Sequence, residues 1–258
     1  MTGVQALWQR EVLRFGRQRS RVTGALLQPI VFWLLLGAGL SGSFRPGGAD
    51  DMSYLQYFYP GALALVLLFT AIFATISVVE DRRSGFLQGV LVAPITRGRI
   101  VLAQALGATT VAVLQAVLFL VLAPFAGVPV TLVGIVDTVV AAALVAFALS
   151  NLGLAIAWRM DSTQGFHAIM NLLLLPIWFL SGAFFPEAGV GWVLKAAMAV
   201  NPLTYGVGLL RRALYAGSSS AVPAEVPGVA VCTVITLVFA AGMFWLATAV
   251  ARRSSTLA

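Results

Sequence analysis

Long runs of apolar residues, separated by short charged segments, restrict this chain to one broad class of fold. The run from Pro60 to Val79 holds no charged residue. At a rise of about 1.5 Å per residue, a helix of roughly twenty residues crosses the ~30 Å hydrocarbon core of a bilayer. Hydrophobic residues make up 60% of the chain and charged residues only 10%, which is typical of a polytopic membrane protein.

The apolar runs predict an all-α protein with six membrane-spanning helices and no water-soluble domain of useful size. The expected spans are residues 24–42, 60–79, 100–125, 130–158, 168–185 and 229–250. The loop before the second span is expected to end in an interfacial aromatic cluster of Tyr54, Tyr57, Phe58 and Tyr59. We interpret residues 1–258 as a single transmembrane domain.

The N-terminal segment, residues 1–23, predicts a helix that lies in the membrane interface. Val4, Trp8, Val12 and Phe15 fall on one side of this helix. Its other side carries arginines that are expected to face anionic lipid head groups, namely Arg10, Arg14, Arg17 and Arg21. A cleaved secretory signal is the competing interpretation, and we reject it because the region before the apolar run is too long.

The segment between the second and third spans is both charged and amphipathic. Its apolar residues recur at helical spacing and predict a short surface helix, with Phe86, Leu87, Val90, Leu91 and Pro94 on one side. Glu80 and Asp81 lie where the second span leaves the membrane, so they are expected to fix the depth of this helix.

Three groups of motifs occur in the order seen in the permeases of type-2 ABC exporters, and the chain resembles that family over nearly its whole length. The motifs are Glu80-Asp81-Arg82-Arg83-Ser84-Gly85-Phe86-Leu87 with Ala93-Pro94-Ile95-Thr96-Arg97, then Leu180 to Pro186, then Asn201 to Tyr205. The family includes drug-resistance, lipo-oligosaccharide and polysaccharide exporters. Each motif is moderately specific alone, and the ordered set is much more so.

The resemblance implies that residues 80–97 form a coupling helix that contacts a separate ABC ATPase subunit, which would carry the ATP and magnesium. The residues expected to make this contact are Glu80, Asp81, Arg82, Arg83, Gly85, Phe86, Leu87, Leu91 and Pro94. The permease would work as a homodimer or paired with a related permease, surrounded by membrane lipids. The alternative is that residues 80–97 form an ordinary solvated loop.

Residues 187–228 admit two interpretations, a seventh span or an external hairpin with its linker. Pro202 would break a spanning helix, which favours two short helices joined at Asn201-Pro202. The resemblance also implies an external re-entrant hairpin here, with Asn201, Pro202 and Tyr205 as its marker residues. With six spans, twelve of the 16 lysines and arginines lie on the side of the termini. This bias predicts a plasma (inner) membrane protein with both termini in the cytoplasm.

Several function classes are disfavoured. Lys195 is the single lysine and no glycine-rich loop precedes it, so this chain holds no phosphate-binding P-loop, and no cofactor is expected. One histidine and one cysteine cannot form a metal cluster. The net charge of +7 does not indicate nucleic-acid binding, because the arginines flank apolar runs.

The resemblance implies that this chain is a transport subunit and not an enzyme, and that it exports an amphiphilic, lipid-linked or drug-like substrate. A secondary transporter or channel without ATP coupling is the alternative. Three polar residues within the spans are candidates for a substrate pathway, namely Asp137, Asn151 and Asn171. Helix-to-helix hydrogen bonds would explain the two asparagines equally well, and an interfacial position would explain Asp137.

Overall fold

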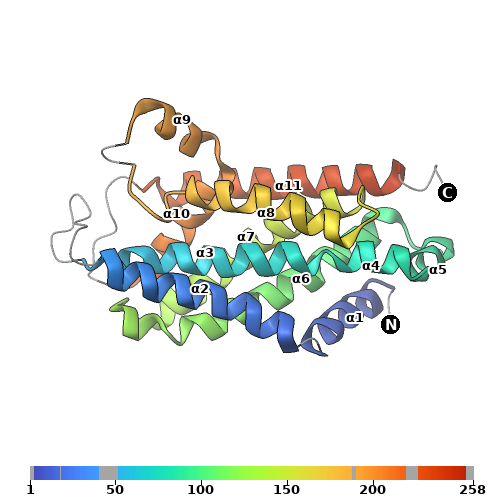
Figure 1. Ribbon diagram of the computed structural model, residues 1–258, viewed down its shortest axis with the longest axis horizontal. Helices are drawn as coiled ribbons and strands as arrows, with labels where there is room; N and C mark the ends of the chain where they lie inside the picture. Colours follow the sequence, from blue (N-terminus) through green and yellow to red (C-terminus); the bar gives the residue numbers. More distant parts are fainter. Residues whose placement is uncertain (1–2, 18, 41–51, 188–189, 219–225, 254–258) are drawn as a thin grey trace.

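In the computed structural model, residues 3–17, 19–40, 52–187, 190–218 and 226–253 are described, and every regular element among them is helical (Figure 1). The all-α expectation is confirmed for these residues. The helices are α1 (Gly3–Arg17), α2 (Arg19–Leu40), α3 (Tyr54–Ala74), α4 (Ser77–Arg83), α5 (Phe86–Val92), α6 (Arg97–Leu120), the 3₁₀ turn η1 (Ala123–Ala126), α7 (Leu132–Ala157), α8 (Thr163–Phe179), α9 (Trp192–Val200), α10 (Pro202–Leu214) and α11 (Val229–Arg253).

Helix α3 lies at the centre of the bundle. Every residue from Tyr57 to Ile72 is buried, because α2, α6, α7 and α8 pack around this helix. A helix that is apolar on all sides is stable only when it is enclosed in this way. The core of the molecule therefore follows the axis of α3.

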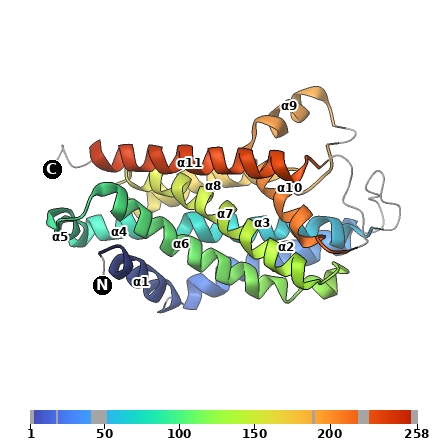
Figure 2. The ribbon, with the colours of Figure 1, turned by 180° about the vertical axis from the view of Figure 1, so that it is seen from behind.

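Helices α1 and α11 pack on the helices that surround α3. Helix α7 packs against α6 and α11, and α1 lies along α6 (Figure 2). Helix α5, the start of α1 and the end of α11 lie at one end of the bundle, while α9 and α10 lie at the other end (Figure 1). The two ends are referred to below as the α5 end and the α10 end.

Within the described part of the chain, four helical stretches are long and apolar enough to cross a membrane: Tyr54–Arg83 (α3 with α4), Arg97–Leu120, Leu132–Ala157 and Val229–Arg253. The first predicted span corresponds to α2, whose apolar described part is Leu26–Leu40, and the fifth corresponds to α8, which has 17 residues. Helices α9 and α10 pass the same test only as a pair, bent by 80°. The count of six spans stays a prediction.

The aromatic cluster before the second predicted span is not an interfacial loop, contrary to our expectation. Tyr54, Tyr57, Phe58 and Tyr59 form the first turns of α3 and are at most 2% exposed. The helix begins earlier than Pro60 because the Ser53 hydroxyl accepts a hydrogen bond from the Gln56 N–H and caps its first turn.

The first turns of α3 hold the Leu180–Pro186 segment in place. The Tyr54 hydroxyl donates to the carbonyl of Phe184, and the Tyr57 hydroxyl donates to that of Gly182. At Gly61 the backbones approach closely, because a Cβ there would lie 2.7 Å from the Ala183 Cβ. This motif is therefore packed into the core at the α10 end.

Candidate functional site: a charged junction between α1 and α4

The segment expected to be one surface helix consists of two short helices. The chain leaves α3 through a turn at Thr75 and Ile76, continues as α4, and changes direction at Gly85 before α5. Gly85 has a φ of 76°, a left-handed conformation that glycine adopts without steric cost. The acidic pair Glu80 and Asp81 therefore lies on α4, separate from the apolar residues of α5.

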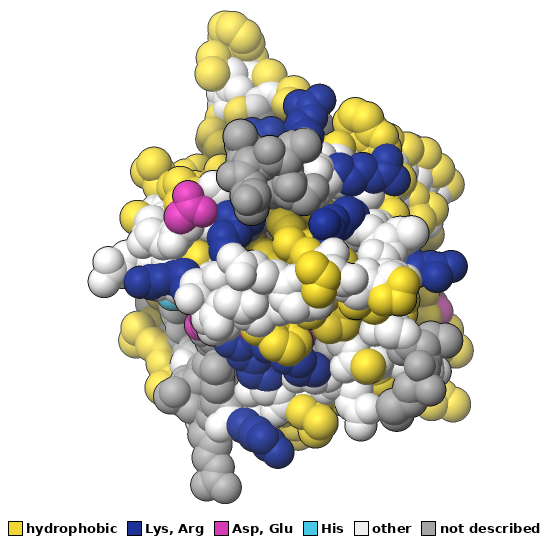
Figure 3. Space-filling model, turned by 90° about the vertical axis from the view of Figure 1, so that its right-hand side faces the viewer, with side chains coloured by type: hydrophobic (Ala, Val, Ile, Leu, Met, Phe, Trp, Pro, Cys, Tyr) yellow, Lys and Arg dark blue, Asp and Glu magenta, His cyan; other side chains and the backbone are white. Residues whose placement is uncertain are grey.

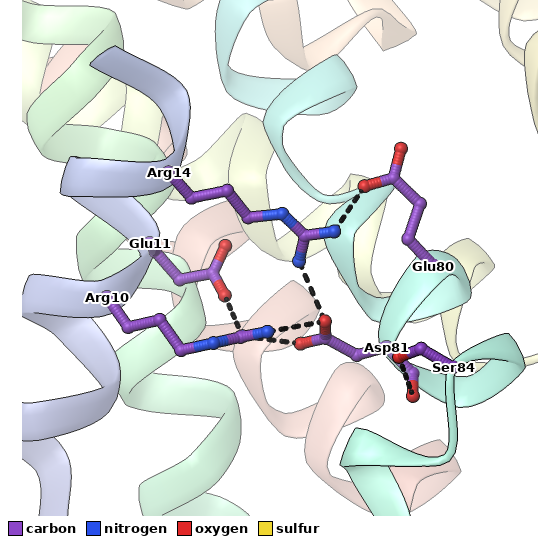
Figure 4. A network of polar contacts seen from close by, with 6 residues as sticks. All are labelled: Arg10, Glu11, Arg14, Glu80, Asp81 and Ser84. Carbon is purple, nitrogen blue, oxygen red and sulfur yellow. Dashed lines mark hydrogen bonds and ion pairs between the residues drawn. The ribbon is translucent and has the colours of Figure 1, made fainter. Parts of the chain in front are cut away.

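Asp81 is the centre of an ion-pair network that joins α4 to α1 (Figure 4). Its side chain is only 3% exposed. Arg10 binds both carboxylate oxygens, with Nη1 at 2.6 Å from Oδ2 and Nη2 at 2.7 Å from Oδ1. Arg14 adds a third hydrogen bond, with its Nη1 at 2.7 Å from Oδ1. Such bidentate contacts fix the relative orientation of the two side chains as well as their distance.

Two further carboxylates extend the network. Arg14 also donates to Glu80, with 2.6 Å between Nη2 and Oε2. Arg10 donates to Glu11 on its own helix, with 3.1 Å between Nη1 and Oε1. Arg10 and Arg14 are four residues apart on α1, so they share one face and reach α4 together. This arrangement corrects the expectation that these two arginines face lipid head groups.

Burial changes the acidity of Glu11. Loss of solvent is the largest effect and raises the pKa of this carboxyl above its usual value, while a hydrogen bond with Ser77 acts in the opposite direction. The nearby charge of Asp81 raises the pKa further. The charged form of Glu11 is therefore less favourable in the folded junction than in the unfolded chain.

Replacing Glu11 with glutamine is expected to stabilise the protein at neutral pH. Because the pKa of Glu11 is higher in the folded than in the unfolded protein, ionising this carboxyl destabilises the fold. The destabilisation is absent at low pH, where the carboxyl is protonated in both states. It grows as the pH rises from the unfolded pKa to the folded pKa. Thermal unfolding midpoints of the purified protein, measured from about pH 4 to about pH 8, should differ between variant and wild type only toward the higher values. A pH-independent difference would contradict this assignment.

Arg82 ties the same short helix to the end of α7. Its Nη2 donates to the carbonyl of Trp158 at 2.6 Å, and its Nη1 donates to that of Met160 at 3.1 Å. Nη1 also contacts the carboxylate of Asp161 at 2.9 Å, but that carboxylate is 88% exposed. Arg83, by contrast, is exposed. Helix α4 is thus fastened to α1 on one side and to α7 on the other.

The apolar residues of α5 divide between the interior and the surface. Leu87 is 3% exposed and belongs to the core, so in this structure it offers little surface to the ATPase that we expect it to contact. Leu91 is partly buried. Phe86 and Val92 are 41% and 87% exposed, and the Arg10 guanidinium lies 3.8 Å from the centre of the Phe86 ring. Pro94, just after α5, is exposed and follows an extended residue.

Basic side chains gather on the α5 end of the molecule (Figure 3). The exposed arginines of the segments that reach this end are Arg83, Arg99, Arg159, Arg252 and Arg253. This end therefore has the charge expected of a cytoplasmic face.

The predicted hairpin residues lie at the α10 end. Asn201 joins α9 to α10, and its side chain caps α10 by accepting from the Leu203 N–H and also donates to the carbonyl of Ile177. Pro202 occupies the first position of α10, where its missing N–H costs nothing. The Tyr205 hydroxyl donates to the carbonyl of Ala199 across the bend. The two short helices are present as expected, while their external, re-entrant placement stays a prediction.

The three polar residues considered for a substrate pathway have different environments. Asp137 and Asn171 are exposed, on α7 and α8 respectively. Asn151 is fully buried on α7, and its amide donates to the carbonyl of Phe147 one turn earlier. Asp137 and Asn151 are separated by about 21 Å along α7, at about 1.5 Å per residue. A single chain therefore does not bring these two residues to one site.

Sequence reasoning missed the main feature of the site, namely the pairing of α1 with α4. The signal that could have found it is the combination of two arginines four residues apart with an acidic pair that follows an apolar span. The sequence patterns mark both groups of residues, but they lead us to expect lipid head groups around the arginines and an ATPase beside the acidic pair.

Comparisons with known proteins identify the family of this chain. Residues 2–215 match the model of the ABC-2 type transporter family. The chain is 27% identical over 209 residues to Nodulation protein J of Rhizobium leguminosarum bv. viciae, covering 80% of each protein. It is 26% identical over 216 residues to the putative transport permease ycf38 of Cyanophora paradoxa, covering 83% of this chain and 74% of that protein. The chain therefore belongs to the ABC-2 type transporter family.

Proposed function

We propose that this protein is the membrane-spanning subunit of an ATP-driven exporter, and that α5 receives the motion of a separate ATPase subunit. One observation carries the proposal. Helix α5 presents Val92 and Phe86 on the surface, while the adjacent α4 is fastened to the bundle through the buried Asp81. Exposed apolar residues beside an anchored charge network suit a docking surface that transmits force.

The contacts supply three routes from α5 into the bundle. Helix α4 follows α3 after a short turn, so a displacement of α5 reaches the central helix directly. Arg10 and Arg14 carry the displacement into α1, and Arg82 carries it into the end of α7. ATP, bound with magnesium on the partner, would drive the two partner subunits together and switch the permease dimer from inward to outward facing.

The distribution of charge supports an orientation for the permease, and its apolar spans suit an amphiphilic substrate. The basic α5 end is assigned to the cytoplasm, which places both termini there and the bend at Asn201 on the outside, in the plasma (inner) membrane. The permease dimer, of identical or related chains, would export an amphiphilic, lipid-linked or drug-like molecule. The ABC-2 family membership supports an ABC transporter permease.

Replacing Val92 with aspartate tests the docking role of α5. Because Val92 is 87% exposed, the permease should still fold and insert. Placing a charge in an apolar contact is expected to weaken ATPase binding by about tenfold to a hundredfold. The measurements are co-purification of the ATPase with the permease and ATP hydrolysis by the reconstituted complex.

The matched control is Gln88→Asp, which places the same side chain on an exposed polar position of the same helix. It should leave ATPase binding near the wild-type level. Wild-type binding and hydrolysis with Val92→Asp would show that α5 is not the contact, and the coupling proposal would then fail.

A further inference from the structure

Arg211 on α10 is a buried arginine that has no counter-ion among the described residues. The residue is 6% exposed, and no ion pair involves it in the part of the chain that the structure describes. Its Nη2 donates to the carbonyls of Tyr57 and Gly182 over 3.3 and 3.4 Å. Its Nε is buried and has no hydrogen-bond partner among the described residues.

This environment satisfies only part of the hydrogen-bonding capacity and charge of the guanidinium. An arginine carries five N–H donors and stays charged at all physiological pH values, and both of its hydrogen bonds here are long. The guanidinium also lies 4.3 Å from the centre of the Tyr57 ring, whose face attracts cations. Carbonyl dipoles and a ring supply partial negative charge, whereas buried charges in proteins are normally matched by a full opposite charge.

A cavity of about 40 Å³ is lined in part by Arg211. Its lining includes Arg211, Tyr57, Ser181, Thr204 and Glu187. A water molecule needs about 10–15 Å³ of such space, so the cavity has room for a small polyatomic group. Glu187 is the one carboxylate among the lining residues, and it makes no described ion pair with Arg211.

We propose that this cavity binds an oxyanion, namely the phosphate group of a membrane lipid or of a phosphorylated solute, with Arg211 as its counter-ion. The planar guanidinium fork matches the spacing of two oxygens on a phosphate group. Arg211 lines the cavity, and its positive charge supplies the attraction. This site does not involve the α5 end, so a negative result for phosphate binding would leave the proposed coupling role of α5 unaffected.

The test uses the full chain in phospholipid-free maltoside micelles and measures the thermal unfolding midpoint at increasing ligand concentration. A ligand that binds only the folded protein raises the midpoint, and the rise grows with the ratio of ligand concentration to Kd. The probes are dioctanoyl phosphatidate, inorganic phosphate, and dioctanoylglycerol, which has the same acyl chains but no phosphate. We expect phosphatidate to raise the midpoint and dioctanoylglycerol to have no effect. A rise with inorganic phosphate as well identifies a soluble phosphate source, and a rise with phosphatidate alone identifies a lipid head group.

Two variants each remove one positive charge at the α10 end of the bundle. Arg211→Gln is expected to weaken phosphatidate binding at least tenfold. Lys195→Gln is the matched control and should bind as the wild type does, since Lys195 is exposed on α9 and does not line the cavity. Equal binding by the wild type and Arg211→Gln would overturn the proposal.

Glu187→Gln keeps the test decisive if Arg211→Gln fails to fold, since it changes only a partly buried loop residue. Removing the one competing carboxylate should tighten phosphatidate binding. Binding by Glu187→Gln but not by the wild type would show that Glu187 is the internal counter-ion, and this result would overturn the proposal. The proposal would also fail if dioctanoylglycerol raised the midpoint as much as phosphatidate does. It would fail likewise if phosphatidate raised the midpoint of neither the wild type nor Glu187→Gln.

Discussion

Replacing Asp81 with asparagine is expected to separate α1 from α4, at a cost of about 2–4 kcal/mol to the junction. The substitution preserves shape but leaves Arg10 and Arg14 facing a neutral amide that is almost fully buried. Breaking a buried pair by removing one partner is costly because the remaining charges lose their compensation. The expected cost lies below the largest known values because the two arginines are 31% and 27% exposed.

Hydrogen exchange of the α1 backbone in the purified full chain measures this effect. Exchange in α1 should become faster in Asp81→Asn, while exchange in the central α3 should change little. The matched control is Asp161→Asn, since that carboxylate is 88% exposed and its pairing with Arg82 should contribute about 0–1 kcal/mol. Unchanged protection of α1 in Asp81→Asn would mean that packing of α1 on α6 holds the helix without the ion pairs.

Replacing Gly61 with valine is expected to prevent correct packing at the α10 end. A Cβ at this position would lie 2.8 Å from the Ala183 carbonyl oxygen and 2.9 Å from the Ala183 Cα, so the clash involves backbone that cannot rotate away. Overpacking of a core commonly costs about 1–3 kcal/mol, and a clash with backbone exceeds that range. The shift would also break the hydrogen bond from the Trp178 indole to the Gly61 carbonyl.

The yield of monodisperse protein after detergent extraction and its thermal midpoint measure the damage. The matched control is Gly242→Val on α11, where a new Cβ meets nothing within 4 Å. The control should be extracted as the wild type is, while Gly61→Val should be lost to aggregation. A normal midpoint for Gly61→Val would show that α3 and the Leu180–Pro186 segment can separate without cost.

Local sequence patterns alone predict several parts of this structure correctly. The fourth predicted span, residues 130–158, differs from α7 by no more than two residues at either end, because a long apolar run is bounded by Thr131, which caps the helix, and by polar residues after Trp158. The break at Asn201 was also readable, since proline restricts both its own backbone angles and those of the residue before it. The ordered motifs led to the family, which the comparisons confirm.

The packing partners of each helix face were decided only by the tertiary structure. Periodicity correctly marked Arg10 and Arg14 as one face of a helix, but it could not tell a lipid head group from Asp81, which lies about seventy residues away in the chain. The aromatic residues at the start of α3 and Leu87 posed the same problem. Lipid tails and a protein core are both apolar, so a hydrophobic pattern shows that a side chain leaves water and does not show which of the two it enters.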